Sequence, residues 1–453
     1  MSLANLLPLA VLATLTAAAE SPQRQETEAQ RLHRRGVQCM DEIERADCAI
    51  ENFEALMRTS TSDRELVTDG MLRLIRLYRR SDDPDAVKPL LRKFWDAGMK
   101  RSSRGHVPHS TRFIPGDFDV VLNVDVERLV AAPLSKRLGA DARDTLFTCD
   151  EARRTVIDDR RRQRRAERKA QATGRDVDAV LAEQSAADRK RESDRKAAQA
   201  RSNGGKPQAT PIMFTGTCPV ALALGEDDLS RWRRMTLAFA HADFSRSITF
   251  VQIPDLDTKL AAATSGARLV QIAPDHWRVP GTQYEGGDVD VARLDLDELL
   301  IAPAGIIGEL IAARGSRRPS IDRTLDQLIA HVPRDTGFFL VLTADAMVDL
   351  GLGSMKKGAR GFLQALLPKP KGMQVAGVIG DDFGLFTRVP TDNAVKGRAM
   401  VSIARAMIER RSEADDASAK MLAGLDVAEA SDRRALLASY VLSAAQIEAL
   451  MLD

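Results

Sequence analysis

Aromatic residues are scarce in this chain of 453 residues and make up 4% of it. Aromatic side chains supply the stacking platforms of many nucleic-acid-binding proteins and the anchors of many interfaces. The composition therefore disfavours a broad surface for stacking bases or sugars. A large excess of one charge is also absent, because 66 basic residues stand against 64 acidic ones. Binding to a nucleic acid would therefore need a local basic patch.

Familiar catalytic and metal-binding motifs are missing as well. The sequence contains no G-x-S-x-G, H-E-x-x-H, G-x-G-x-x-G or C-x-x-C motif, and no His stands at metal-ligand spacing from a Cys. We therefore predict neither a cofactor nor a metal ion. The acidic run at 288–298 alternates with aliphatic residues, which favours a solvated strand face over a calcium loop.

One short motif could carry catalysis. Ser354 and Lys357 fit the S-x-x-K pattern, in which a Lys one helical turn away activates a Ser nucleophile. Neither S-D-N nor K-T-G follows, so a solvated surface serine is the favoured interpretation. The pair still defines an alternative function, a hydrolase with an unrecognised site.

The N-terminus resembles a secretory signal. Residues 3–19 form an apolar run that ends in three alanines, followed by Glu20. The run is short for a membrane span, and no basic residue precedes it. We expect cleavage after residue 19 and export to the periplasm or the medium, with no transmembrane span in the mature chain. The alternative is an N-terminal helix of the first domain.

The four cysteines all follow this segment, and disulfides are their natural use in an exported protein. On one unbroken helix the Cα atoms of Cys39 and Cys48 would lie roughly 13 Å apart, so the two can pair only if the chain turns between them. We expect Cys149 to pair with Cys218.

Residues 26–98 show the apolar spacing of helices. The stretch "LIRLYRRSDDPDAVKPLLRKFWDAG", with Leu74, Tyr78, the turn at 82–83 and Ala86, resembles the helix–turn–helix of a tetratricopeptide repeat at about 48–98. The resemblance implies a helical hairpin that packs on another element, and it weakly implies peptide binding. The polar stretch at 99–117 reads as a linker.

The rest of the chain contains an internal duplication. "FDVVLNVDVERLVAAPLSKRLG" from 118 resembles "GFFLVLTADAMVDLGLGSMKKG" from 337, and the stretch from 234 resembles that from 372. Each unit reads β-α-β-β-α-β-β-α, and the order of elements carries the similarity. The general pattern is similar to uncharacterised exported bacterial envelope proteins, and this resemblance implies no activity.

We therefore predict an α+β protein with an N-terminal helical hairpin and two similar units with mainly antiparallel sheets. The first unit carries a charged helical insert at about 143–226, whose ends lie near the expected disulfide. The predicted parts are a signal peptide at 1–19, a helical segment at 26–98, a linker at 99–117, a first unit at 118–315, a connecting helix at 316–336 and a second unit at 337–453.

The insert holds the strongest basic run of the chain. Residues 153–169 contain good helix formers, a large excess of arginine and no aromatic side chain. A solvated arm is the favoured interpretation, and contact with an anionic surface or acidic partner is the alternative. Specific nucleic-acid recognition is disfavoured. The residues of the possible anionic contact are Arg160, Arg161, Arg162, Arg164, Arg165 and Arg168.

From these features we expect a non-catalytic binding or scaffold protein of the bacterial cell envelope. Its partner is expected to be a protein, with an anionic surface as the second possibility. The hydrolase and the anionic-surface binder are the two alternatives to this function.

Overall fold

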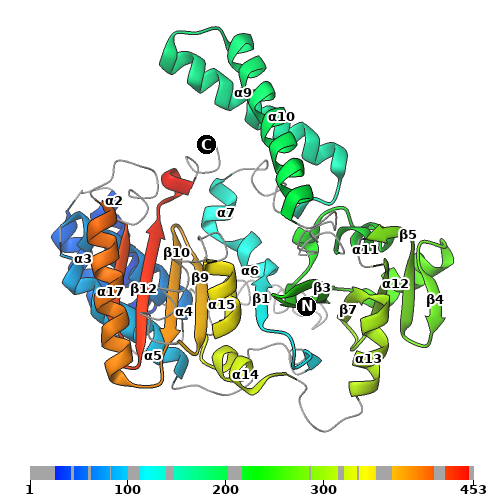
Figure 1. Ribbon diagram of the computed structural model, residues 1–453. Helices are drawn as coiled ribbons and strands as arrows, with labels where there is room; N and C mark the ends of the chain where they lie inside the picture. The colour runs from blue at the N-terminus through cyan, green and yellow to red at the C-terminus, as the bar shows by residue number, and fades with distance from the viewer. Residues whose placement is uncertain are drawn as a thin grey trace, which may run out of the picture. The chain divides into compact units, whose positions relative to one another are not determined.

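The computed structural model describes residues 26–41, 45–59, 63–81, 83–99, 113–138, 147–202, 217–284, 287–314, 321–333, 336–352, 370–412 and 424–447. The chain divides into two compact units, Met1–Leu77 and Tyr78–Asp453. The proposed signal at 1–19 and most of the expected linker lie outside the described residues. Each unit is described by itself, and most of the elements are labelled in Figure 1.

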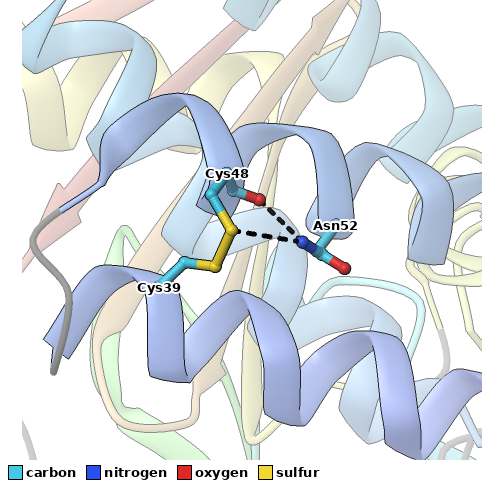
Figure 2. The surroundings of a disulfide bond; sticks show 3 residues. All are labelled: Cys39, Cys48 and Asn52. Atoms are coloured by element: carbon cyan, nitrogen blue, oxygen red, sulfur yellow. Dashed lines mark hydrogen bonds between the residues drawn. A yellow bond between two sulfur atoms is a disulfide. The ribbon is translucent and has the colours of Figure 1, made fainter.

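The first unit contains helices α2 (Glu28–Asp41), α3 (Ala46–Arg58) and most of α4 (Arg64–Arg80). The Cys39–Cys48 disulfide joins the end of α2 to the start of α3, with 5.8 Å between the two Cα atoms. Figure 2 shows this bond and the amide of Asn52, which donates a hydrogen bond of 2.8 Å to the Cys48 carbonyl. Because α2 ends at Asp41 and α3 begins at Ala46, the two cysteines do not lie on one unbroken helix, and they can come close enough to pair.

A buried polar network connects α2 to α4 within the first unit. The carboxylate of Asp69 lies 2.7 Å from Nε2 of His33 and accepts a hydrogen bond of 2.7 Å from Nε of Arg73. Burial alone would raise the pKa of Asp69, but these two partners lower it to about 2. His33 and Arg73 therefore supply the hydrogen bonds and the positive charge that stabilise the carboxylate of Asp69 away from water.

The second unit is built on one twelve-stranded sheet in which every neighbouring pair is antiparallel. The sheet order is β11-β12-β10-β9-β8-β1-β2-β3-β7-β6-β5-β4. The prediction of a mixed protein with N-terminal helices and an antiparallel sheet is confirmed. The strands are β1 (Val120–Asp125), β2 (Arg234–Ala240), β3 (Asp243–Gln252), β4 (Val270–Ala273), β5 (His276–Tyr284), β6 (Gly287–Arg293), β7 (Glu298–Pro303), β8 (Phe338–Thr343), β9 (Gly372–Ile379), β10 (Phe383–Pro390), β11 (Leu425–Glu429) and β12 (Ala435–Leu442).

Helices cover both faces of this sheet. One face packs against α6 (Val126–Ala131), α11 (Thr217–Ala223) and α12 (Leu256–Ser265) near β1 to β7, and against α15 (Ala344–Leu352) and α17 (Ala394–Ser412) near β8 to β12. The opposite face packs against α13 (Ala304–Arg314), α14 (Arg323–Ala330) and α5 (Pro84–Met99). Alternating strand residues therefore face two apolar layers, so the strands read as nearly continuous apolar runs.

The same connectivity occurs on both sides of the central β1–β8 pair. On one side the sheet runs β1-β2-β3-β7-β6, and on the other it runs β8-β9-β10-β12-β11. A helix, α12 or α17, follows the third strand of each half. The first half also has the hairpin β4–β5 at its edge, which the expected β-α-β-β-α-β-β-α order does not include.

Each half begins with a strand that passes directly into a helix. The carboxylate of Asp125 at the end of β1 accepts a hydrogen bond of 3.0 Å from the backbone N–H of Arg128 in α6. The hydroxyl of Thr343 at the end of β8 is 3.5 Å from the backbone N–H of Ala346 in α15. Asp and Thr are favoured at this position because their oxygen satisfies an unpaired N–H of the first helical turn.

The first half is interrupted after α7 (Pro133–Arg137) by a helical hairpin of α9 (Glu151–Thr173) and α10 (Val177–Ser202). The Cys149–Cys218 disulfide lies at its base, with 5.1 Å between the Cα atoms. Gly174 ends α9 in the left-handed conformation, with φ at 64°, which favours glycine. The hairpin lies within the predicted insert at 143–226.

Candidate anion-binding site

The residues singled out from the sequence do not form one site. Ser354 and Lys357 lie outside the described residues. The arginines of the basic run lie on α9, where the described side chains of Arg160, Arg162, Arg164, Arg165 and Arg168 are exposed. Nothing is described for the side chain of Arg161. The Cys149–Cys218 pair belongs to the base of the hairpin.

A cationic cavity lies elsewhere, in the second half of the sheet. It has a volume of ≈ 200 Å³ and is lined by the end of α14, the chain entering β9, the end of β10 and the β11–β12 turn. The charged and titratable side chains on its wall are Lys371, Arg388, Arg434, His331 and Asp432. Three cations therefore surround the space with a single carboxylate.

Arg388 is the inner wall of this cavity. Its side chain lies on β10, and the residue is 7% exposed. Nη1 donates a hydrogen bond of 2.9 Å to Oε1 of Gln374, which is fully buried on the neighbouring strand β9. Nε2 of Gln374 donates to the carbonyl oxygen of Leu328 in α14. This chain of contacts holds the guanidinium in one orientation.

The β11–β12 turn forms the outer wall. The carbonyl oxygen of Arg434 accepts hydrogen bonds from the backbone N–H of Thr391 at 2.7 Å and from its hydroxyl at 3.0 Å. The backbone N–H of Arg434 donates a hydrogen bond of 2.9 Å to the Asp432 carboxylate. Arg433 between them has a φ of 59°, a conformation that costs free energy in a residue other than glycine. The turn is therefore tied to the end of β10.

Close packing around Gly372 fixes the third wall. Gly372 has a φ of 153°, and a Cβ atom there would lie 2.3 Å from the Leu342 carbonyl oxygen and 2.6 Å from Cδ1 of Leu328. Only glycine permits this approach of β9 to β8 and α14. Lys371 directly precedes it and reaches the rim of the cavity, with its side chain 53% exposed.

The electrostatics of the cavity favour an anion. Burial lowers the pKa of Arg388, while the charges of Asp432 and Asp96 act in the opposite direction. An arginine nevertheless stays protonated in proteins. These two carboxylates offset part of the cost of burying the cation, and a bound anion would offset more of it. The planar guanidinium matches the geometry of a carboxylate or phosphate group.

The sequence analysis did not find these residues. Their signal was the Arg in the apolar strand "FGLFTRVP", because a charged side chain on a buried strand is unusual. The other cations come from segments far apart in sequence, and only the fold brings them together.

Comparison with protein-family models, with curated proteins and with solved structures found no match. Within the described ranges, no helix is both long enough and apolar enough to cross a membrane. The described side chains also include no group of three or more His, Cys, Asp or Glu residues that could hold a metal ion.

Proposed function

We propose that this chain is a non-catalytic binding protein of the bacterial cell envelope, and that its cavity takes a small anionic ligand. The observation that carries the proposal is Arg388, a buried guanidinium held by Gln374 at the wall of a cavity with two further cations. The two disulfides and the signal-like N-terminus support export, because disulfides persist in oxidising compartments.

The dimensions of the cavity limit the ligand. Pockets for drug-sized molecules measure about 300–1,000 Å³, so a cavity of ≈ 200 Å³ suits a molecule with one phosphate or carboxylate group and few other atoms. Asp432 disfavours a second negative charge beside it, and it can accept a hydrogen bond from a hydroxyl or ammonium group of the same ligand.

The sheet is, in this proposal, one module used twice, and the site belongs to the second copy. The strand register supports this. Leu122 and Leu340 face each other on β1 and β8. Following the paired residues from strand to strand, outward from this pair, gives residues of similar type at the same step in the two halves. The successive pairs are Leu237 and Val375, Thr249 and Thr387, Ile301 and Ala438, and Val291 and Val427.

Thermal unfolding in the presence of inorganic phosphate tests the proposed function. A ligand that binds only the folded state stabilises it by about 2.7 kcal/mol at a hundred times its Kd. Phosphate should therefore raise the Tm of the full chain above its value in chloride at equal ionic strength. Arg388→Met should abolish this rise.

Arg405→Met is the control for loss of an arginine elsewhere, because Arg405 is an exposed arginine of α17 that donates to the Val427 carbonyl at 3.3 Å and is not part of the cavity. This variant should keep the response to phosphate. The proposal fails if phosphate and a small monocarboxylate such as acetate leave the wild-type Tm unchanged, or if both variants respond like the wild type.

A further inference from the structure

The cationic cavity beside Arg388 also presents a hydrogen-bond acceptor to its ligand. Asp432, in the β11–β12 turn, is the carboxylate of its wall. Its Oδ1 accepts a hydrogen bond of 2.9 Å from the backbone N–H of Arg434, which holds the side chain in the turn. An ionised carboxylate has about four acceptor positions, so this bond leaves Asp432 able to accept a hydrogen bond from a ligand.

His331 adds a second acceptor at the end of α14. Its Nδ1 lies 2.5 Å from the carbonyl oxygen of Gln327, one turn earlier in the helix. Because a carbonyl oxygen can only accept, we assign the proton of the neutral ring to Nδ1, and Nε2 is then an acceptor. A ligand that carries acceptors alone would therefore offer no donor to either Asp432 or His331.

The charges around Arg388 limit the net charge of the ligand. Two carboxylates act on this guanidinium, Asp432 on the cavity wall and Asp96 of α5, which is not part of the lining. With Lys371 and Arg434 included, three cations stand against these two carboxylates. A ligand with a single negative charge neutralises the difference, whereas a phosphate monoester carries about 1.5 to 2 negative charges at pH 7.

Lys371 contributes to this balance although a further carboxylate lies near it. Its Nζ is 4.0 Å from Oδ1 of Asp392. The other oxygen of Asp392 is only 2.7 Å from Nζ of Lys396, which is not part of the cavity lining. Lys396 therefore offsets most of the charge of Asp392, and the ammonium group of Lys371 keeps its effect at the rim.

We infer that the cavity takes a small α-hydroxy carboxylate of about three or four carbon atoms, with its carboxylate at Arg388 and its hydroxyl donating to Asp432. This inference rests on the proposed function and names the class of ligand within it. A planar carboxylate matches the guanidinium, and a hydrogen bond to an ionised acceptor is stronger than one between neutral groups. A ligand of this size fits a cavity of ≈ 200 Å³.

The same balance favours a hydroxyl over an ammonium group. An α-amino acid has no net charge, so it would leave the positive surplus of the cavity in place. Its ammonium group would also be repelled by Lys371 and Arg434, which line the same space. A hydroxyl can donate to Asp432 without this repulsion.

Calorimetric titration of the full chain with three ligands of nearly equal shape tests the inference. Lactate, propionate and alanine differ only in the hydroxyl, hydrogen or ammonium group on the α-carbon. Lactate should bind about ten-fold more tightly than propionate, at the weak end of the range for a hydrogen bond to a charged group, because Asp432 is exposed. Lactate should also bind more tightly than alanine and than inorganic phosphate at equal ionic strength.

Asp432→Ala should bring the affinities for lactate and propionate within about two-fold of each other, since the acceptor of the hydroxyl is lost. Asp326→Ala is the control, because Asp326 is an exposed carboxylate of α14 outside the cavity lining, and it should keep the ten-fold difference. The unfolding temperature without ligand verifies that both variants fold.

The inference is overturned if wild type binds lactate and propionate equally, if alanine or phosphate binds more tightly than lactate, or if Asp432→Ala weakens lactate and propionate by the same factor. In each of these cases the proposed function still stands, provided that Arg388→Met abolishes the binding. If no anion binds the wild type, the proposed function itself fails.

Discussion

The two halves of the sheet place different chemistry at equivalent positions. In the first half, a row of facing residues across four strands reads Asn123, Thr236, Phe250 and Leu300. In the second half, the equivalent row reads Val341, Gln374, Arg388 and Leu437. All eight residues are buried. The same strand order therefore holds a phenylalanine beside a buried, hydrogen-bonded Asn–Thr pair in one half and a buried cation in the other.

This difference distinguishes residues that the sheet requires for folding from residues that line the cavity. Phe250 shows that an apolar side chain suits the position on β3, so the architecture does not require the charge of Arg388 on β10. In the second half, α14 reaches the sheet through the contact of Gln374 with Leu328, and the cavity lies beside it. In the proposed function, the buried guanidinium serves a ligand in addition to its contact with Gln374.

The halves also exchange contacts across the central strand pair. His241 in the β2–β3 turn of the first half lies 3.0 Å from the carboxylate of Asp349 in α15 of the second half. Asp381 in the β9–β10 turn of the second half pairs at 2.9 Å with Arg137 in α7 of the first half. Each turn thus reaches a helix that comes soon after the other half's first strand, α15 in one case and α7 in the other, with the signs of the charges reversed.

The largest expected effect comes from the equivalent pair Phe250 and Arg388. Phe250→Ala should lower the free energy of unfolding by about 3–5 kcal/mol, because it removes a buried ring and leaves a cavity. Arg388→Met should cost about 1–3 kcal/mol, because Gln374 loses its donor while the cost of burying a charge disappears. Urea unfolding measures both. A larger loss for Arg388→Met would mean that the cation serves folding, and the comparison of the halves would be broken.

The insert of the first half provides the next prediction. Removing the Cys149–Cys218 disulfide, by changing both residues to Ala, should cost up to about 4 kcal/mol, because the bond closes a loop with a sequence separation of 69. Removing Cys39–Cys48, with a separation of 9, should cost up to about 2.5 kcal/mol. Chemical denaturation of the two double variants checks this order. An equal loss would indicate that native contacts, and not loop closure, dominate.

Sequence patterns revealed the parts of the fold that depend on local order. The strand that ends in Asp125 and passes into a helix follows from residues close together in the chain, and the insert was located by comparing the two similar units. That β1 pairs with β8 to form one continuous sheet could not be predicted from the sequence. Both strands are mainly apolar, and an apolar pattern does not indicate which strand pairs with which. The hairpin β4–β5 was also missed, since the turn at Asp275 lies within a run read as one strand.

The candidate site was beyond sequence reasoning for a related reason. Lys371 and Arg434 each look like an ordinary basic residue in its own segment, and Arg388 is unusual only as a charge within an apolar strand. Their convergence depends on the antiparallel pairing of β9, β10 and β12 and on the position of α14. A site assembled from the ends of several elements leaves no local motif, in contrast to a site that is built on one loop.

The smallest expected effect concerns the reciprocal contacts between the halves, of which one contains a histidine. Burial lowers the pKa of His241, but its hydrogen bonds to Asp119 and Asp349 outweigh this and raise the pKa above 6.5. Both ring nitrogens can donate only when the imidazole is protonated. The contact therefore stabilises the fold fully below about pH 6.5, and its contribution is lost as the pH rises through the raised pKa of the folded state.

Urea unfolding midpoints measured from mildly acidic to mildly alkaline pH test this contact. The wild type should lose about 1 kcal/mol or less across this range, since Asp349 is 46% exposed. His241→Gln should flatten that part of the profile. Asp381→Asn should leave its shape unchanged, because the contact between Asp381 and Arg137 contains no imidazole. If His241→Gln keeps the wild-type profile, the two halves are not coupled through this imidazolium, and the reciprocity of the turns is geometric only.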